Sequence, residues 1–167
     1  MLKISRWVRM SAVVGVALSC ASASSSAFAG QLIANDLGKC ASDAGPAVMV
    51  EIRGFSTSGG KLRVQSYRAT RDEWLQKGRW INRIEAEVRP AGGMMRVCIP
   101  LPAAGRYGIA VRHDVDGNGR TDLTKDGGGF SNNPKATIFN LGKPSVDKVT
   151  INVGQHPVSI AIRLQYM

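Results

Sequence analysis

Oxygen-bearing side chains are concentrated in residues 113–133, which read HDVDGNGRTDLTKDGGGFSNN. Positions 1, 3, 5, 7 and 9 of a calcium-loop pattern are taken by Asp114, Asp116, Asn118, the Arg120 carbonyl and Asp122. Gly119 stands at position 6, where such loops turn sharply. Oxygen ligands suit calcium or magnesium, and a flexible glycine-rich loop favours the larger ion. The spacing therefore predicts a calcium site.

The pattern differs from an EF-hand at both ends. Position 12, which carries a bidentate glutamate in EF-hands, is Lys125, and the next acid is Asp126. Residues 107–112 alternate in polarity, which is the periodicity of a strand and not of an entering helix. We therefore expect a weak calcium loop at a strand end. The simpler alternative is that the Asp-Gly and Asn-Gly pairs only form turns.

Residues beside the loop are candidates for a supporting role. His113 precedes the first ligand and could orient Asp114. Asp126 is a spare acid, and residues 130–133 could fold back toward the metal or border a pocket. The residues expected to support the ion or line a pocket rim are His113, Asp126, Phe130, Asn132 and Asn133.

The sequence carries little that indicates catalysis. It has no Gly-x-Ser-x-Gly elbow, no phosphate-binding glycine motif and no zinc signature. The clustered acids of residues 114–126 could in principle hydrolyse a glycan. A glycosidase pair, however, must flank a bond from two sides of a cleft, whereas these acids belong to one loop. Ion binding is the preferred interpretation.

Strand periodicity dominates from Ala47 onward. Apolar residues alternate with polar ones over 47–53, 62–65, 83–88, 95–99, 107–112, 149–153 and 158–164. Each segment has one apolar and one polar face, which indicates antiparallel sheets packed on a single side. The turn at 58–60 predicts a hairpin between the first two strands, and a further short strand is expected at residues 136–139.

One helix is expected near Arg71 to Lys77, because Thr70 and Glu73 form a capping box and Gly78 supplies a stop. Together these elements predict an all-β fold. Its form is a Greek-key β-sandwich of seven or eight antiparallel strands, immunoglobulin-like or transthyretin-like, with one short crossover helix.

Two cysteines remain after the first 29 residues. Alternation points Cys98 away from the apolar face of its strand, where the segment that carries Cys40 could cover it. In an oxidising compartment such a pair forms a disulfide, which would contribute roughly 4 kcal/mol through loop closure. We expect a Cys40–Cys98 bond, with two free thiols as the alternative.

Residues 1–29 have the features of a cleaved signal peptide: a basic start, an apolar run over 10–21 and an Ala27-Phe28-Ala29 site before Gly30. Ala17 stands where a lipoprotein signal needs leucine, which argues against lipidation of Cys20. Residues 30–46 are expected to be a lead-in segment and residues 47–167 the sandwich domain. The mature chain should have no transmembrane segment and should be periplasmic or extracellular.

The chain is strongly basic, with 22 Lys and Arg against 12 Asp and Glu and a net charge of +10. Export makes nucleic acid an improbable partner. The excess positive charge therefore favours an anionic polymer or glycan of the cell envelope, or serves solubility alone.

Three segments carry a family resemblance, namely RYGIAVRHDVDGNGRTD, GGGFSNNP and IAIRLQY. They are similar to exported bacterial proteins grouped as domain of unknown function 2141. The resemblance covers about residues 47 to 167 and is strongest over 105–166, although the stretch between Asp122 and Phe130 is shorter than the family pattern. It implies a secreted β-sandwich and brings no known activity.

The sequence thus predicts an exported, non-enzymatic β-sandwich module with a calcium loop, for binding or structure in the envelope. The alternative is a glycan-processing or hydrolytic accessory enzyme that uses the acidic loop.

Overall fold

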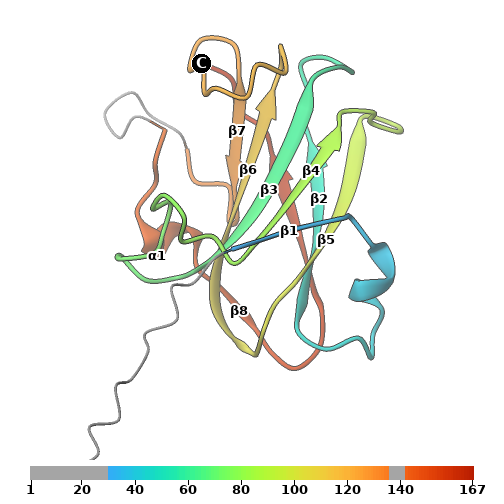
Figure 1. Cartoon of the computed structure of the whole chain (residues 1–167), viewed down its shortest axis with the longest axis vertical. Coiled ribbons are helices and arrows are strands. Elements are labelled where there is room, and N and C mark those ends of the chain that lie inside the picture. Colours follow the sequence, from blue (N-terminus) through green and yellow to red (C-terminus); the bar gives the residue numbers. More distant parts are fainter. Residues whose placement is uncertain (1–29, 136–141) are drawn as a thin grey trace, which may run out of the picture.

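The computed structural model describes residues 30–135 and 142–167, which form two β-sheets packed face to face (Figure 1). The strands are β1 (Gln31–Ile33), β2 (Ala47–Arg53), β3 (Lys61–Arg68), β4 (Asn82–Glu87), β5 (Met94–Pro100), β6 (Gly105–Asp114), β7 (Gly127–Phe130), β8 (Ile151–Val153) and β9 (Val158–Arg163). The larger sheet has the order β1-β4-β3-β6-β7, with β8 also paired to β6, and the smaller one has the order β5-β2-β9. The all-β sandwich is confirmed. The expected signal peptide and the expected strand at 136–139 lie outside the described residues.

The core lies between the sheets and follows the predicted alternation. Val48, Val50 and Ile52 of β2 are fully buried, and so are Val64 and Ile109 of the facing sheet. Burying one such side chain stabilises a fold by roughly 1.5–3 kcal/mol. The apolar face of each strand therefore fixes which of its residues point inward and which point out.

The strand directions differ from the prediction. β2 pairs with β9 in parallel, and β1 pairs with β4 in parallel, whereas the other pairs are antiparallel. The hairpin expected at 58–60 is also wrong, because β2 and β3 lie in different sheets and the chain crosses between them there. Alternation reports the apolar face of a strand but not the direction of its neighbour.

The helix expected at Arg71–Lys77 is wrong as well. Residues 71–75 form turns, in which the Thr70 carbonyl accepts from the N–H groups of Glu73 and Trp74. Leu75, at φ 56°, leaves the helical region. A short helix, α1 (Val146–Val149), occurs instead where strand periodicity had suggested the start of a strand.

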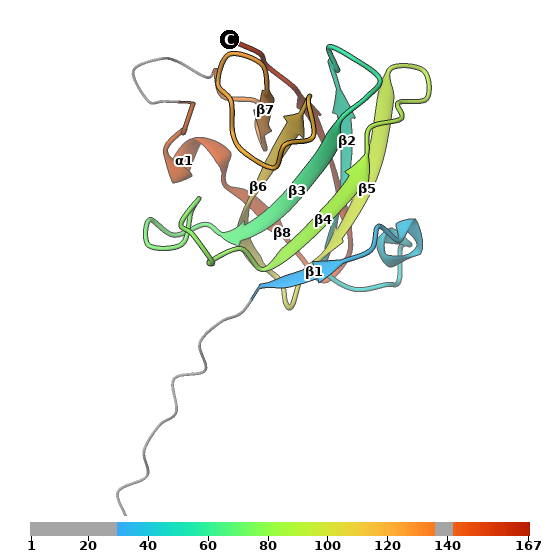
Figure 2. The same cartoon turned by 45° about the horizontal axis from the view of Figure 1, so that its top comes forward.

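The Trp74 ring explains the course of these turns. It packs edge-on against Tyr67, with ring centroids 5.4 Å apart, and its Nε1 donates to the Pro144 carbonyl at 2.9 Å. With Ala110, Val146 and Val149 it forms a small second core on the outer face of the larger sheet. Figure 2 shows α1 beside the turns that join β3 to β4. The second core therefore covers part of that outer face, next to the part that lies beside the acidic loop.

The predicted disulfide is present. Cys40, in the 3-10 helix η1 (Leu37–Cys40), is bonded to Cys98 of β5, with Cα atoms 5.8 Å apart. Asn35 fixes the same segment, because its side chain accepts from the Cys98 N–H and donates to the Arg96 carbonyl. The lead-in segment is thus tied to the smaller sheet. Among the described residues, no helix has the length and apolar character needed to cross a membrane.

Candidate functional site

The candidate site is the loop that joins β6 to β7. β6 alternates, so that Val111 and His113 face the core while Arg112 and Asp114 face outward. Asp114 is nevertheless 98% buried, since only 2% of its surface is exposed. Gly60, in the β2–β3 connection, packs closely against the start of the loop. A Cβ at that position would collide with the Asp114 carbonyl. The start of the loop is therefore held tightly against the sandwich.

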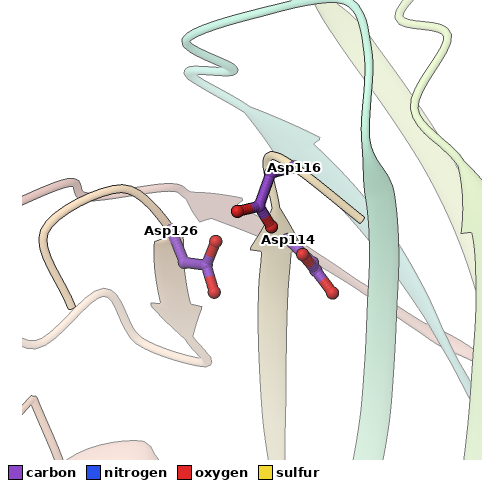
Figure 3. A group of neighbouring side chains, drawn as sticks. All are labelled: Asp114, Asp116 and Asp126. Atoms are coloured by element: carbon purple, nitrogen blue, oxygen red, sulfur yellow. The ribbon is translucent and has the colours of Figure 1, made fainter. Parts of the chain in front are cut away.

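Three carboxyl groups of this loop face one another. Asp114, Asp116 and Asp126 each offer an oxygen, and these atoms all lie within 4.8 Å of one another (Figure 3). Asp114 and Asp126 are buried, whereas Asp116 is exposed. Like charges this close repel unless they are neutralised. The loop therefore concentrates negative charge at one point beside the end of β6.

The two oxygens of Asp114 have unequal surroundings. Oδ2 accepts from the Gly119 N–H at 2.8 Å and from Arg112 Nη2 at 3.1 Å. Oδ1 is buried and has no hydrogen-bond partner within the described part of the chain. A buried polar atom without a partner costs roughly 1–3 kcal/mol. Asp114 Oδ1 is the one carboxylate oxygen in the described part of the chain that is buried without a partner.

The Asp114 carboxyl is ionised at neutral pH. Burial raises its pKa, but the Gly119 N–H, the Arg112 guanidinium and the Gly117 N–H outweigh that effect and hold the pKa below its ordinary value. A charged oxygen, rather than a neutral hydroxyl, is therefore directed into the cluster.

Asp126 closes the loop. Its Oδ1 accepts from the Val115 N–H at 3.2 Å and its Oδ2 from the Asp122 N–H at 2.9 Å, so that it joins both arms of the loop. Asp116 forms a local turn, with its two oxygens accepting from the Asn118 backbone and side-chain amides. Each carboxylate oxygen keeps a further lone pair after one hydrogen bond, so these contacts leave room for a cation.

Two of the ligands expected from spacing make local hydrogen bonds of their own. The Asn118 side-chain oxygen accepts from the Arg120 N–H at 2.6 Å. Asp122 accepts at Oδ1 from the hydroxyl and the N–H of Thr124, and these bonds lower its pKa. The residues after Asp122 turn back, because the Asp126 N–H donates to the Asp122 carbonyl at 2.7 Å. Asp126 thereby joins the cluster of carboxylates, which does not include Asp122.

His113, expected to support the ion, has its side chain on the opposite side of β6 from Asp114. Its ring is fully buried on the core side of β6, with Nε2 2.7 Å from the Gly59 carbonyl and Nδ1 2.7 Å from the Tyr166 hydroxyl. A carbonyl can only accept, so Nε2 carries a proton. The ring ties the β2–β3 connection to the C-terminal segment and does not touch the acidic cluster.

Residues 130–133 do not fold toward the cluster. Asn132 donates from its side chain to the Thr150 carbonyl at 2.9 Å. Asn133 donates to the Ala161 carbonyl and accepts from the Arg163 N–H, so that it continues the edge of β9. Phe130 is the exception, because it borders a cavity beside the loop, as the pocket-rim prediction requires.

Sequence reasoning missed Arg112, which neutralises part of the charge. Arg112 Nη2 contacts Asp114 and Nη1 donates to Thr121 at 2.8 Å. The sequence could have indicated this contact, because Arg112 and Asp114 are two residues apart on a strand and therefore share a face. Three carboxylates and one guanidinium leave a net charge of −2, which matches a divalent cation.

Comparison with known proteins identifies one family. The family model described as an uncharacterized protein conserved in bacteria (DUF2141) matches residues 50–161, which run from within β2 to within β9 and include the acidic loop. No curated protein and no solved structure matches the chain.

Proposed function

Since the chain belongs to the family of uncharacterized bacterial proteins DUF2141, whose description gives no activity, we propose a function from the site itself. The protein is a non-enzymatic, exported β-sandwich module whose β6–β7 loop binds one calcium ion, for binding or structure in the cell envelope.

The buried Oδ1 of Asp114 carries this proposal. It is an ionised oxygen without a partner among the described residues, and two further carboxylates lie within 4.8 Å. A cation held by Asp114, Asp116 and Asp126 would satisfy it and remove the repulsion between the three groups. Water and a loop carbonyl, such as that of Arg120, would complete the ligand set. The ion would then join the end of β6 to the start of β7.

The donor set favours calcium over transition metals. The cluster offers only oxygen, and the one histidine close to it in sequence is turned into the core. Hard oxygen ligands in a flexible loop suit calcium, whereas magnesium requires a strict octahedron. The site lacks a bidentate glutamate, and Arg112 opposes the cation, so we expect weak binding, on the order of 0.1–1 mM.

Export and the absence of catalysis have separate support. The Cys40–Cys98 disulfide suits an oxidising compartment, as does the signal-like composition of residues 1–29. The alternative of a hydrolytic enzyme is less favoured, because the three carboxylates come from one loop and Asp126 uses both oxygens to hold backbone N–H groups. A hydrolase would need carboxylates on two sides of a cleft.

Thermal unfolding tests the metal site. Calcium at ten times its dissociation constant should stabilise the fold by roughly 1.4 kcal/mol, which raises the melting temperature by a few degrees over a sample in chelator. Magnesium at the same concentration should raise it less. Identical melting curves in chelator and in about 10 mM calcium would reject the site. Export is tested separately by N-terminal sequencing of protein from the periplasm, which should begin at Gly30.

A further inference from the structure

A cavity of about 260 Å³ lies on the outer face of the larger sheet, between the acidic loop and the second core. Strands β3, β6 and β7 form its floor. Its size is close to the lower end of small-molecule sites, roughly 300 Å³, so it suits a ligand of about one ring. The lining residues that matter for its chemistry are Arg63, Gln65, Leu75, Arg112, Phe130 and Lys143.

Basic side chains from neighbouring strands meet at this floor. Arg63 of β3 is registered directly opposite Arg112 of β6, an arrangement that is unfavourable for like charges. Arg83 of β4 lies one row away, opposite Gln65. Burial and the charge of Arg63 lower the pKa of the Arg83 guanidinium, whereas Glu85 and Tyr67 raise it, and Arg112 makes the smallest contribution, which lowers it. Three arginines therefore lie close together on this face, and Glu85 of β4 is the acid paired with Arg63 and Arg83.

Two guanidinium nitrogens on this face, Arg83 Nε and Arg112 Nε, are buried and have no acceptor among the described residues. Arg63 donates from Nε to Glu85 at 2.8 Å in an ion pair that is partly exposed to solvent. Arg112 uses its terminal nitrogens on Thr121 and Asp114, whereas its Nε is buried without a partner in the described chain. Lys143 adds a charge at the exposed rim. Arginine forks match the geometry of carboxylate and phosphate groups.

We propose that this cavity binds a small organic anion. Its carboxylate or phosphate group lies among Arg63, Arg112 and Lys143, and its apolar body packs against Leu75 and Phe130. The ligand is therefore a single-ring acid or phosphate monoester rather than a long polymer.

Two acids also line the cavity, and they define how it relates to the cation loop. Asp122 is engaged by Thr124, and Asp126 belongs to the acidic cluster. A cation held at Asp126 would make the cavity more positive and strengthen anion binding. The arginines are present without the ion, so the inference goes beyond the proposed function and does not require it.

The test is a titration of the protein with benzoate, phenyl phosphate and the neutral benzamide, carried out in chelator and in calcium. Amide chemical shifts report the binding. The two anions should shift the amides of β3, β6 and β7 with dissociation constants near or below roughly 1 mM, and benzamide should bind at least about tenfold more weakly. Arg63→Gln and Lys143→Gln should each weaken phenyl phosphate about tenfold. Arg53→Gln is the matched control, because Arg53 lies on β2 of the other sheet and is also paired with a glutamate.

The outcomes separate the two proposals. Anion binding that persists in chelator while calcium leaves the spectrum unchanged keeps the cavity site and removes the cation site. Lys143→Gln alters only an exposed rim residue and is expected to fold. Equal binding of benzamide and benzoate, or no shift with any anion up to about 10 mM, overturns the cavity site.

Discussion

Two polar segments flank β7, and they use their polar atoms in different ways. The segment 131–133 leaves β7 and places its side chains against backbone groups of other elements. The loop 115–126 enters β7 and, with Asp114, brings carboxylates together around an oxygen that has no partner in the described chain. Polar composition therefore marks both segments, whereas their hydrogen bonds separate the segment whose polar atoms are paired from the loop that leaves a buried oxygen without a partner.

Ser131 is the clearest example of a side chain in this segment that bonds to backbone groups of other elements. Its buried hydroxyl donates to the Val149 carbonyl and accepts from the Ile109 N–H, so that one side chain joins β6 to the end of α1. Asn133 does the same for β9. In this segment the side chains replace missing strand partners.

The largest predicted effect comes from a substitution in the segment 131–133. Ser131→Ala leaves a buried N–H and a buried carbonyl without their partner, which should lower the free energy of unfolding by about 3 kcal/mol. Urea denaturation measures it, and Ser145→Ala, at an exposed position whose side chain makes no cap bond, should change little. The gain in stability from calcium should be the same in both variants. A loss of that gain in Ser131→Ala would show that the two segments are not independent.

Asp126 both holds backbone N–H groups and belongs to the acidic cluster. Its substitution should therefore give the next largest effect. Asp126→Asn retains one acceptor oxygen and cannot serve both the Val115 and Asp122 N–H groups. We expect a loss of about 2 kcal/mol in chelator, together with loss of the calcium gain. Chemical denaturation with and without calcium measures both. Asp43→Asn, at an exposed position outside the loop, is the control. Retention of the calcium gain in Asp126→Asn contradicts the ligand set.

Asp116 should affect binding alone. Its oxygens bond only within the loop, to Asn118, and the residue is exposed. Asp116→Ala should abolish the calcium gain of roughly 1.4 kcal/mol and leave the protein in chelator no less stable, because one repulsive charge is removed. Melting curves in chelator and in calcium decide this, and a variant that melts lower in chelator would argue that Asp116 is structural.

Substitution of Asp122 should give the smallest effect. It distinguishes the ligand set expected from sequence spacing from the acidic cluster found in the structure. The calcium-loop pattern makes it a ligand, whereas the structure assigns its Oδ1 to Thr124. Asp122→Ala should therefore keep the calcium gain and lower stability only slightly. If the melting shift with calcium disappears in this variant, the spacing was the better guide.

The sequence predicted the parts of the fold that depend on local pattern. Alternation identified the buried faces of β2 and β3, and the outward direction of Cys98 predicted its bond to Cys40. Alternation carries no information on pairing, so the parallel β2–β9 pair and the crossing at 58–60 could not be found. The turns at 71–75 were mistaken for a helix because Trp74 docking, a tertiary contact, decides their course.

The sequence predicted which loop carries the candidate site but not which of its residues form the acidic cluster. Asp114 and Asp116 come together as the spacing indicates, but the backbone turn after Asp122 replaces that residue with Asp126. The cavity depends on strand register, which sets Arg63 opposite Arg112 across residues far apart in sequence. Local patterns find acidic loops, whereas only the assembled sheet places the charges that surround them.

Calorimetric titration of calcium into the purified wild-type protein tests the central claim most directly. The account predicts one saturable site with a dissociation constant on the order of 0.1–1 mM. Binding should be absent in Asp116→Ala and unchanged in Asp122→Ala. A wild-type protein that releases no binding heat and shows no calcium-dependent stabilisation up to about 10 mM would contradict it, and the loop would then be a set of turns.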